Sequence, residues 1–173
     1  MNIFGIGTDI VNIKRIQNSL KKNKNFKKRI FTKFEAKICE KRAKKMNIFG
    51  IGTDIVNIKR IQNSLKKNKN FKKRIFTKFE TKICENRANK INCFAKRFAA
   101  KEALFKALGI HNKLSFLDVE VKNNISGLPN FQIKGNSLKN LKKIFKNRKF
   151  KIHLSLSDDE PWAVASVIIF IYK

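Results

Sequence analysis

Residues 47–55 show the alternation of a β-strand, with glycine at two alternate positions in the middle of the stretch. Successive side chains of a strand point to opposite faces, so the pattern predicts that Ile48, Gly50, Gly52 and Asp54 share one face. Because glycine has no side chain, a bulky ligand can approach the backbone beside Asp54.

The hydrophobic positions after this strand are spaced as they are in helices. Ile58, Ile61 and Leu65 recur at intervals of three or four residues, and lysines and arginines occupy other positions. The pattern continues through residues 71–90, with an expected break near Thr77, whose hydroxyl can cap a helix. We therefore expect helices on both sides of Thr77.

A longer helix is predicted from about residue 91 to residue 108, where Gly109 is a good terminator. Glu102 falls on the apolar stripe of this helix, although a carboxylate beside packed phenylalanines is costly unless a cation or several donors compensate it. An ordinary pair with Lys106, one helical turn later, would also explain its position. The apolar members of the stripe are Ile91, Phe94, Phe98, Phe105 and Leu108.

After Gly109 the period changes from helical to alternating. The expected elements are a strand at 115–122, a turn at 127–130, a returning strand at 131–135, a basic amphipathic helix at 137–148, and two strands at 150–157 and 162–172. The predicted fold class is α+β, with early helices packed on a small, mainly antiparallel sheet.

The first 45 residues are repeated almost unchanged as residues 46–90. The copies differ only at Ala36/Thr81, Lys41/Asn86 and Lys44/Asn89, which leaves 42 identities in 45. We expect residues 46–173 to be the complete domain and residues 1–45 to be a dispensable segment, since so short a piece buries no core of its own. The alternative is that the first copy displaces the second in the sheet, with Asp9 in place of Asp54.

The formal charge of +29 indicates an anionic partner, such as nucleic acid, a phosphorylated small molecule, anionic lipid or an acidic protein. The three cysteines lack metal-site spacing and predict reduced thiols on packed helices. No secretory signal is visible, and the longest apolar run, residues 163–172, is too short to span a bilayer. A cytoplasmic protein without a membrane span is expected.

Two carboxylates stand out as a candidate metal site. Asp54 ends a glycine-lined strand and Glu102 faces inward from a helix. Two carboxylates with open coordination positions suit Mg²⁺, which keeps several waters and accepts phosphate oxygens. Asp54 has a simpler alternative role as the cap of the helix that follows it.

Four segments occur in one order: "GIGTDIVNIKRI", "FKKRIFTKFE", "RFAAKEALFKALG" and "HLSLSDDEPWAVASVII". Together they closely resemble the holo-acyl-carrier-protein synthase family of 4′-phosphopantetheinyl transferases, over essentially all of residues 46–173. The resemblance implies a homotrimer with active sites between neighbours. It also implies transfer of phosphopantetheine from coenzyme A to a serine of apo acyl carrier protein, with release of adenosine 3′,5′-bisphosphate. In this family Asp54 and Glu102 would hold Mg²⁺.

The resemblance suggests roles for further residues of the helix that carries Glu102. Lys101 is a candidate catalytic contact to phosphate or to developing charge. Arg97, Lys106 and Gly109 are candidates for binding coenzyme A, although solvated positions on a helix remain an alternative reading for Arg97 and Lys106.

The resemblance also assigns a docking surface for the carrier protein. It does not identify the general base that accepts the serine proton. Lys59 and Arg60 would dock the acidic carrier protein. Where the family often has histidine, this chain has Asp158, so we hypothesise that Asp158 or a water on the metal accepts the serine proton.

Two other classes of function compete with this reading. A nucleic-acid-binding module would suit the charge, but the phenylalanines sit mostly at helical core spacing and no RRM, KH or zinc pattern is present, so no nucleic-acid partner is expected. The second alternative is an inactive, duplicated relic of the transferase.

Overall fold

The computed structural model describes residues 46–109 and 114–172. The predictions for residues 1–45, including the role of Asp9, lie outside them. In chain order the elements are β1 (Met46–Asn57), α4 (Ile58–Lys67), α5 (Lys69–Ile75), α6 (Lys78–Glu85), α7 (Lys90–Leu108), the 3₁₀ turn η1 (Phe116–Asp118), β2 (Val119–Asn123), β3 (Pro129–Ile133), α8 (Gly135–Ile144), β4 (Phe150–Asp159) and β5 (Trp162–Tyr172).

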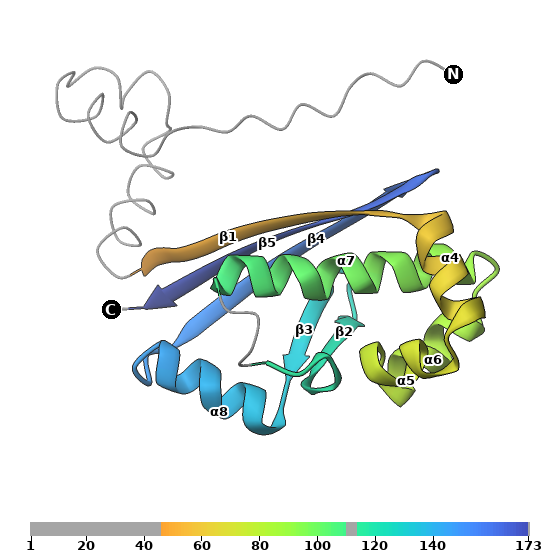
Figure 1. Ribbon diagram of the computed structural model, residues 1–173. Helices are drawn as coiled ribbons and strands as arrows, with labels where there is room; N and C mark the ends of the chain where they lie inside the picture. The colour runs from red at the N-terminus through yellow and green to blue at the C-terminus, as the bar shows by residue number, and fades with distance from the viewer. Residues whose placement is uncertain (1–45, 110–113, 173) are drawn as a thin grey trace, which may run out of the picture. The chain divides into compact units, whose positions relative to one another are not determined.

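Helix α7 lies along one face of an antiparallel sheet with the strand order β1-β5-β4 (Figure 1). The central strand, β5, pairs with β1 on one side and with β4 on the other. Strands β2 and β3 form a separate antiparallel hairpin, and α4, α5 and α6 gather near one end of α7 (Figure 1). The predicted α+β class with early helices and a small antiparallel sheet is confirmed.

Several predicted elements have different bounds in the structure. The returning strand expected at 131–135 is β3 at Pro129–Ile133. The strand expected from residue 115 begins only at Val119, because η1 comes first and the Ser115 hydroxyl accepts a hydrogen bond from the Leu117 N–H. The helix expected up to residue 148 ends at Ile144, and Lys146 and Asn147 then adopt positive φ angles of 51° and 56°.

The contact between β1 and α7 is closest at two glycines of β1. A Cβ atom placed on Gly50 would lie 1.9 Å from the Ala107 carbonyl oxygen, and one on Gly52 would lie 2.1 Å from the Ala103 carbonyl oxygen. Such distances leave no room for any side chain. The glycine-lined face of the predicted strand is therefore the face on which α7 packs.

Ile48 does not share this face, contrary to the alternation predicted from the sequence. The pairing of β1 with β5 shifts register between Ile48 and Gly50. A bulge of this kind places one extra residue in the strand and reverses the faces on either side. The extra residue, Phe49, packs its ring edge-on against the buried ring of Phe145, with centroids 4.8 Å apart, whereas Ile48 is 41% exposed.

The helix caps settle an alternative that the sequence left open. The N-cap of α4 is Asn57, whose side-chain oxygen accepts the Arg60 N–H at 3.1 Å, so Asp54 is a strand residue and caps no helix there. The break expected near Thr77 is confirmed. Thr77 caps α6 in a capping box with Glu80, in which each side chain accepts a hydrogen bond from the backbone N–H of the other residue.

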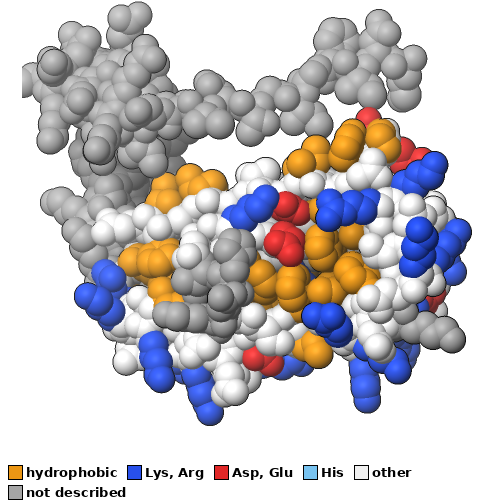
Figure 2. All heavy atoms as spheres, in the orientation of Figure 1, with side chains coloured by type: hydrophobic (Ala, Val, Ile, Leu, Met, Phe, Trp, Pro, Cys, Tyr) orange, Lys and Arg blue, Asp and Glu red, His pale blue; other side chains and the backbone are white. Residues whose placement is uncertain are grey.

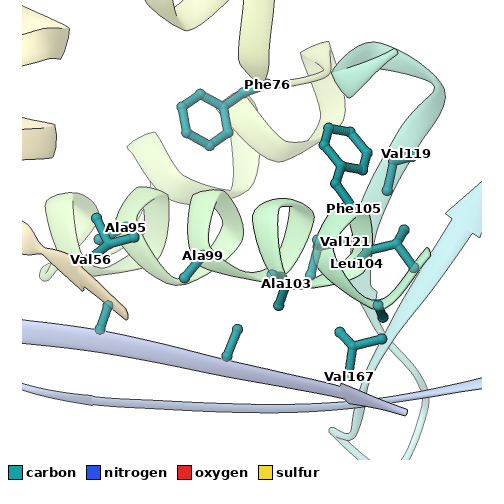
Figure 3. Close-up of a cluster of buried hydrophobic side chains, with 14 of the residues drawn as sticks. Val56, Phe76, Ala95, Ala99, Ala103, Leu104, Phe105, Val119, Val121 and Val167 are labelled. Carbon is teal, nitrogen blue, oxygen red and sulfur yellow. The ribbon is translucent and has the colours of Figure 1, made fainter. Parts of the chain in front are cut away.

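The core forms on both sides of α7 (Figure 3). Ala99 and Ala103 point toward the sheet, where small side chains allow the helix to approach, and Phe76 and Phe105 fill the space on the opposite side. Burial on both sides makes α7 the central element of the fold. In the part of the chain that the structure describes, no helix combines the length and apolar character needed to cross a membrane.

The cysteine prediction was wrong for two of the three residues. Cys84 on α6 and Cys93 on α7 are joined in a disulfide with a Cα–Cα distance of 5.4 Å. No feature of the sequence indicated this pairing, because the cysteines stand nine positions apart with a turn between two helices in between. The bond attaches α6 directly to α7.

Replacing Gly52 with alanine should destabilise the fold, because the new methyl group would overlap backbone atoms of α7. We expect a loss of about 1–3 kcal/mol in the free energy of unfolding, measured by urea denaturation. Thr53→Ala, on the exposed face of the same strand, is the matched control and should change stability by about 0.5 kcal/mol or less. Equal stabilities of the two variants would contradict the close contact.

Candidate active site

A pocket of about 360 Å³ lies where β1, α4, α5 and α7 meet, and we call it the carboxylate pocket. Figure 2 shows a face of the molecule on which acidic side chains lie near the centre, with Lys or Arg side chains on both sides and hydrophobic side chains beside them. Apart from Ser64, the residues that line the pocket are of these kinds: Asp54, Ile55, Val56, Arg60, Ile61, Ser64, Phe71, Phe98, Glu102 and Lys106.

The packing of β1 on α7 brings the two predicted carboxylates together. Asp54 lies two residues beyond Gly52 on the same face of β1, and Glu102 directly precedes Ala103, the residue on which Gly52 packs. Asp54 and the half-buried Glu102 therefore line one pocket although they are far apart in the sequence.

A lysine of the chain already neutralises Asp54. The Lys106 ammonium donates to Asp54 Oδ1 at 2.7 Å and to the Thr53 carbonyl oxygen at 3.3 Å. The Asp54 side chain is 12% exposed and that of Lys106 is 47% exposed. The carboxylate is thus largely shielded from water, while its cationic partner remains accessible.

The donor set of the pocket fits a hard divalent cation. Asp54 and Glu102 supply carboxylate oxygens, and Asp54 already holds a cation in the form of the Lys106 ammonium. Among the described residues, no group of three or more His, Cys, Asp and Glu side chains could hold a metal. Asp54 and Glu102 are the residues that would hold such a cation, which would supply positive charge beside a bound anion.

Two of the other predicted site residues, Arg97 and Asp158, line a second pocket of about 600 Å³, which we call the arginine pocket. It is formed mainly by the first half of α7, the β2–β3 hairpin and the end of β4, and it contains both Arg97 and Asp158. Its lining is Arg87, Ala88, Asn89, Asn92, Cys93, Lys96, Arg97, Asn123, Gly127, Pro129, Leu156 and Asp158.

Arg97 is a buried cation, and its Nε–H donor has no hydrogen-bond partner. Its Nη1 donates to Cys93 Sγ at 2.9 Å and to the Cys93 carbonyl oxygen at 3.4 Å, whereas its buried Nε has no hydrogen-bond partner. Burial lowers the pKa of Arg97, which the nearby Glu80 carboxylate partly counteracts. Arg97 is therefore a buried cation at the arginine pocket and not the solvated helix residue of the alternative reading.

Asp158 does not lie in the carboxylate pocket. Its Oδ1 pairs with Lys96 Nζ at 2.5 Å and its Oδ2 accepts a hydrogen bond from Asn92 Nδ2 at 3.0 Å. Burial raises the pKa of Asp158, but the hydrogen bonds from Lys96 and Asn92 outweigh it, so the net pKa is lowered. A carboxylate held in this way is a weak base, and the general-base role predicted for Asp158 is not supported within one chain.

Lys101 does not reach either pocket, which corrects the phosphate contact predicted for it. Its side chain is fully buried, and its ammonium donates to Glu80 Oε2 at 2.7 Å, the Ile75 carbonyl oxygen at 2.7 Å and the Phe116 carbonyl oxygen at 2.9 Å. An ammonium has three donors, and all three are used. Lys101 joins α7 to α5, α6 and η1 and has a structural role.

The predicted docking residues lie on the exposed side of α4. Lys59 and Arg60 line an open groove of about 520 Å³ between α4 and α5. Arg60, Ser64 and Phe71 line the carboxylate pocket as well, so the groove and the pocket adjoin. Gly109, predicted to contact coenzyme A, ends α7 in a left-handed conformation with φ 66°. It lines neither the groove nor either pocket.

The model of the 4′-phosphopantetheinyl transferase superfamily, acyl-carrier-protein synthase type, matches residues 50–166. The chain belongs to this family. A holo-[acyl-carrier-protein] synthase of Pelagibacter ubique is 44% identical over 171 residues, which span 98% of either chain. As a family member the chain is an enzyme, a transferase of the holo-acyl-carrier-protein synthase kind.

Solved structures of the synthase family share the fold. The enzyme of Neisseria meningitidis is 35% identical with a TM-score of 0.62, and the match covers 71% of this chain and 98% of that one. The enzyme of Bacillus anthracis, in complex with CoA (3′,5′-ADP), is 33% identical with a TM-score of 0.57 and coverages of 73% and 97%.

The sequence reasoning missed two residues of this transferase, Asn92 and Lys96, which hold Asp158 in the arginine pocket. Both lie on the face of α7 that carries this pocket, one helical turn apart, and Arg97 follows directly. That spacing was visible in the sequence, but no signal identified which strand end would face it.

Replacing Lys101 with methionine should destabilise the transferase, because Glu80 would keep its charge in a fully buried position without its ammonium partner. We expect a loss of about 3–5 kcal/mol in the free energy of unfolding, measured by urea denaturation. The double variant Lys101→Met/Glu80→Gln should lose less than Lys101→Met alone, and Lys142→Met, on the exposed side of α8, should lose almost nothing. A Lys101→Met variant as stable as the parent would contradict the structural role.

Proposed function

We propose that this transferase moves 4′-phosphopantetheine from coenzyme A to a serine hydroxyl of apo acyl carrier protein, in a reaction that depends on Mg²⁺ and releases adenosine 3′,5′-bisphosphate. The observation that carries this proposal is the meeting of Asp54 and Glu102 in one pocket lined also by cations. The complex of the Bacillus anthracis relative with coenzyme A supports the donor substrate.

The transfer breaks a phosphorus–oxygen bond of the coenzyme A diphosphate and forms a new one to the serine oxygen. Adenosine 3′,5′-bisphosphate leaves, and water accepts the serine proton. Bound Mg²⁺, held by Asp54 and Glu102, would neutralise charge on the diphosphate oxygens. Lys106 and Arg60 line the same pocket and supply further positive charge toward the phosphates. The pocket thereby stabilises the negative charge that develops on the leaving group, and it positions the diphosphate for in-line attack.

The carrier protein would dock along α4. Lys59 and Arg60 are exposed on this helix and line the open groove that adjoins the carboxylate pocket. An acidic partner is attracted to such a surface, and the shared lining residue Arg60 would place its serine next to the diphosphate.

We further propose a homotrimer with active sites between neighbouring copies. The face of the sheet opposite α7 carries Ile51 and Ile55, each 59% exposed, beside Ile168 and Val164 of β5, and no described element covers it. Exposed apolar faces of this kind mark interfaces. Assembly would also let the arginine pocket of one copy complete the carboxylate pocket of the next, with Arg97 as a phosphate contact.

The catalytic domain is proposed to be residues 46–173, with residues 1–45 dispensable. The described residues of both pockets, and the stretch that the family model matches, lie within the second copy and the sequence after it.

The function is tested by incubating apo acyl carrier protein with coenzyme A and the full chain, and following the mass gain of the carrier protein. We expect modification that stops on addition of EDTA and returns with Mg²⁺. Asp54→Asn should lower the rate by about a hundredfold or more, because the metal loses one of its two protein ligands. A chain that begins at Met46 should keep the rate of the full chain.

The duplication offers a matched control for this experiment. Asp9→Asn makes the same change in the first copy and should leave the rate unaltered. Loss of transfer with Asp9→Asn, and not with Asp54→Asn, would show that the first copy supplies the ligand. Absence of transfer by the parent chain would refute the function itself.

Sites shared between copies can be tested by mixing two inactive variants. Asp54→Asn damages only the carboxylate pocket and Arg97→Gln only the arginine pocket. If each site combines pockets from two copies, a randomly mixed assembly regains about a quarter of the parental activity, since that fraction of interfaces joins two intact halves. If both pockets of one chain serve one site, mixed assemblies stay as inactive as the single variants.

A further inference from the structure

The ion pair between Lys106 and Asp54 occupies the carboxylate that the proposed function assigns to a metal. Lys106 Nζ lies 2.7 Å from Asp54 Oδ1, in a place where only 12% of the Asp54 side chain is exposed. A carboxylate so shielded from water needs a compensating positive charge. In the structure described here, the chain supplies that charge itself.

A divalent ion and an ammonium group repel one another when they share one carboxylate. Two positive charges a few ångströms apart raise the free energy of the arrangement even when solvent screens them partly. The Lys106 ammonium is the group able to move, because it ends a flexible four-carbon stem and its side chain is 47% exposed. The backbone of Asp54 is held in the β1–β5 ladder, where it pairs with Ala165.

The diphosphate of coenzyme A offers the displaced ammonium a new partner. Lys106 lines the carboxylate pocket, so a small rotation of its side chain keeps the ammonium beside any anion that enters. A phosphate oxygen would then accept the hydrogen bond that Asp54 accepts without ligand.

We propose that Lys106 is an exchangeable counter-ion that couples metal binding to diphosphate binding. It neutralises Asp54 in the empty pocket, weakens metal binding there, and transfers to the diphosphate when metal and coenzyme A arrive together. Coupling of this kind is reciprocal: coenzyme A strengthens metal binding by the same factor by which the metal strengthens coenzyme A binding. The inference rests on the proposed function and adds an order of preference, in which the complete metal–diphosphate pair binds better than either component.

The test measures Mn²⁺ binding to the full chain by electron paramagnetic resonance at one fixed pH, with and without coenzyme A. Lys106→Met should bind Mn²⁺ alone about two- to fivefold more tightly than the parent, the size expected for removing a competing, partly exposed ion pair. It should also lose most of the gain in Mn²⁺ affinity that coenzyme A gives the parent. Thermal denaturation of each variant checks that it is folded.

Two further variants separate charge from other effects. Lys106→Arg retains a cation and should keep the weak Mn²⁺ binding of the parent, whereas Lys142→Met, on α8 and away from the groove and both pockets, should leave both affinities unchanged. If Lys106→Met binds Mn²⁺ no more tightly than the parent, the counter-ion role is refuted while the transferase function stands. If the parent neither binds Mn²⁺ nor modifies the carrier protein, the proposed function falls together with this inference.

Discussion

The approach of strand β1 to helix α7 is the contact on which the rest of the structure depends. Gly50 and Gly52 let the carbonyl groups of Ala107 and Ala103 come so near that no side chain fits between them. This one contact sets the position of the sheet against the helix, and it also carries Asp54 to the pocket of Glu102. The fold and the carboxylate pocket are therefore specified by the same few residues.

The acidic side chains of this strongly basic chain serve three distinct purposes. Glu80 is buried with Lys101 and also accepts the Val121 N–H, so it ties α6 to α7 and β2. Asp158 organises the arginine pocket, and Asp54 lies at the carboxylate pocket beside an accessible cation. The cation is most exposed in the last arrangement, where 47% of the Lys106 side chain is exposed against 31% for Lys96 and 0% for Lys101. Burial of the cation distinguishes a structural pair from a functional one, since Lys101 is fully enclosed and Lys106 is half exposed.

Patterns of neighbouring residues in the sequence predicted the helices and strands well. The alternation in β1 and the helical spacing before Gly109 both follow from nearby residues, and the structure has them where the pattern indicated. What failed depended on tertiary contacts. Ile48 changed face because Phe49 packs on Phe145, nearly a hundred residues away in the chain. The disulfide of Cys84 likewise requires knowing how α6 folds back on α7.

The residues of the candidate site were predicted less accurately than the helices and strands of the fold. Asp54 and Glu102 were paired first from their positions on a glycine-lined strand and on the inward face of a helix, and then by the family resemblance, and both line one pocket in the structure. Position along α7 could not tell Lys101 from Lys106, since the difference depends on which neighbouring elements cover each side chain. Asp158 was placed correctly at a strand end, but the sequence did not reveal that this end faces Arg97.

The position of β1 at the margin of the sheet has a consequence for the acceptor substrate. Among the described strands, β1 has a neighbour on one side only, so the pocket that contains Asp54 opens at the sheet edge beside α4. A folded macromolecule can present a serine at such an opening without any rearrangement of the enzyme. The position of the pocket beside an edge strand is therefore compatible with the protein acceptor of the proposed function.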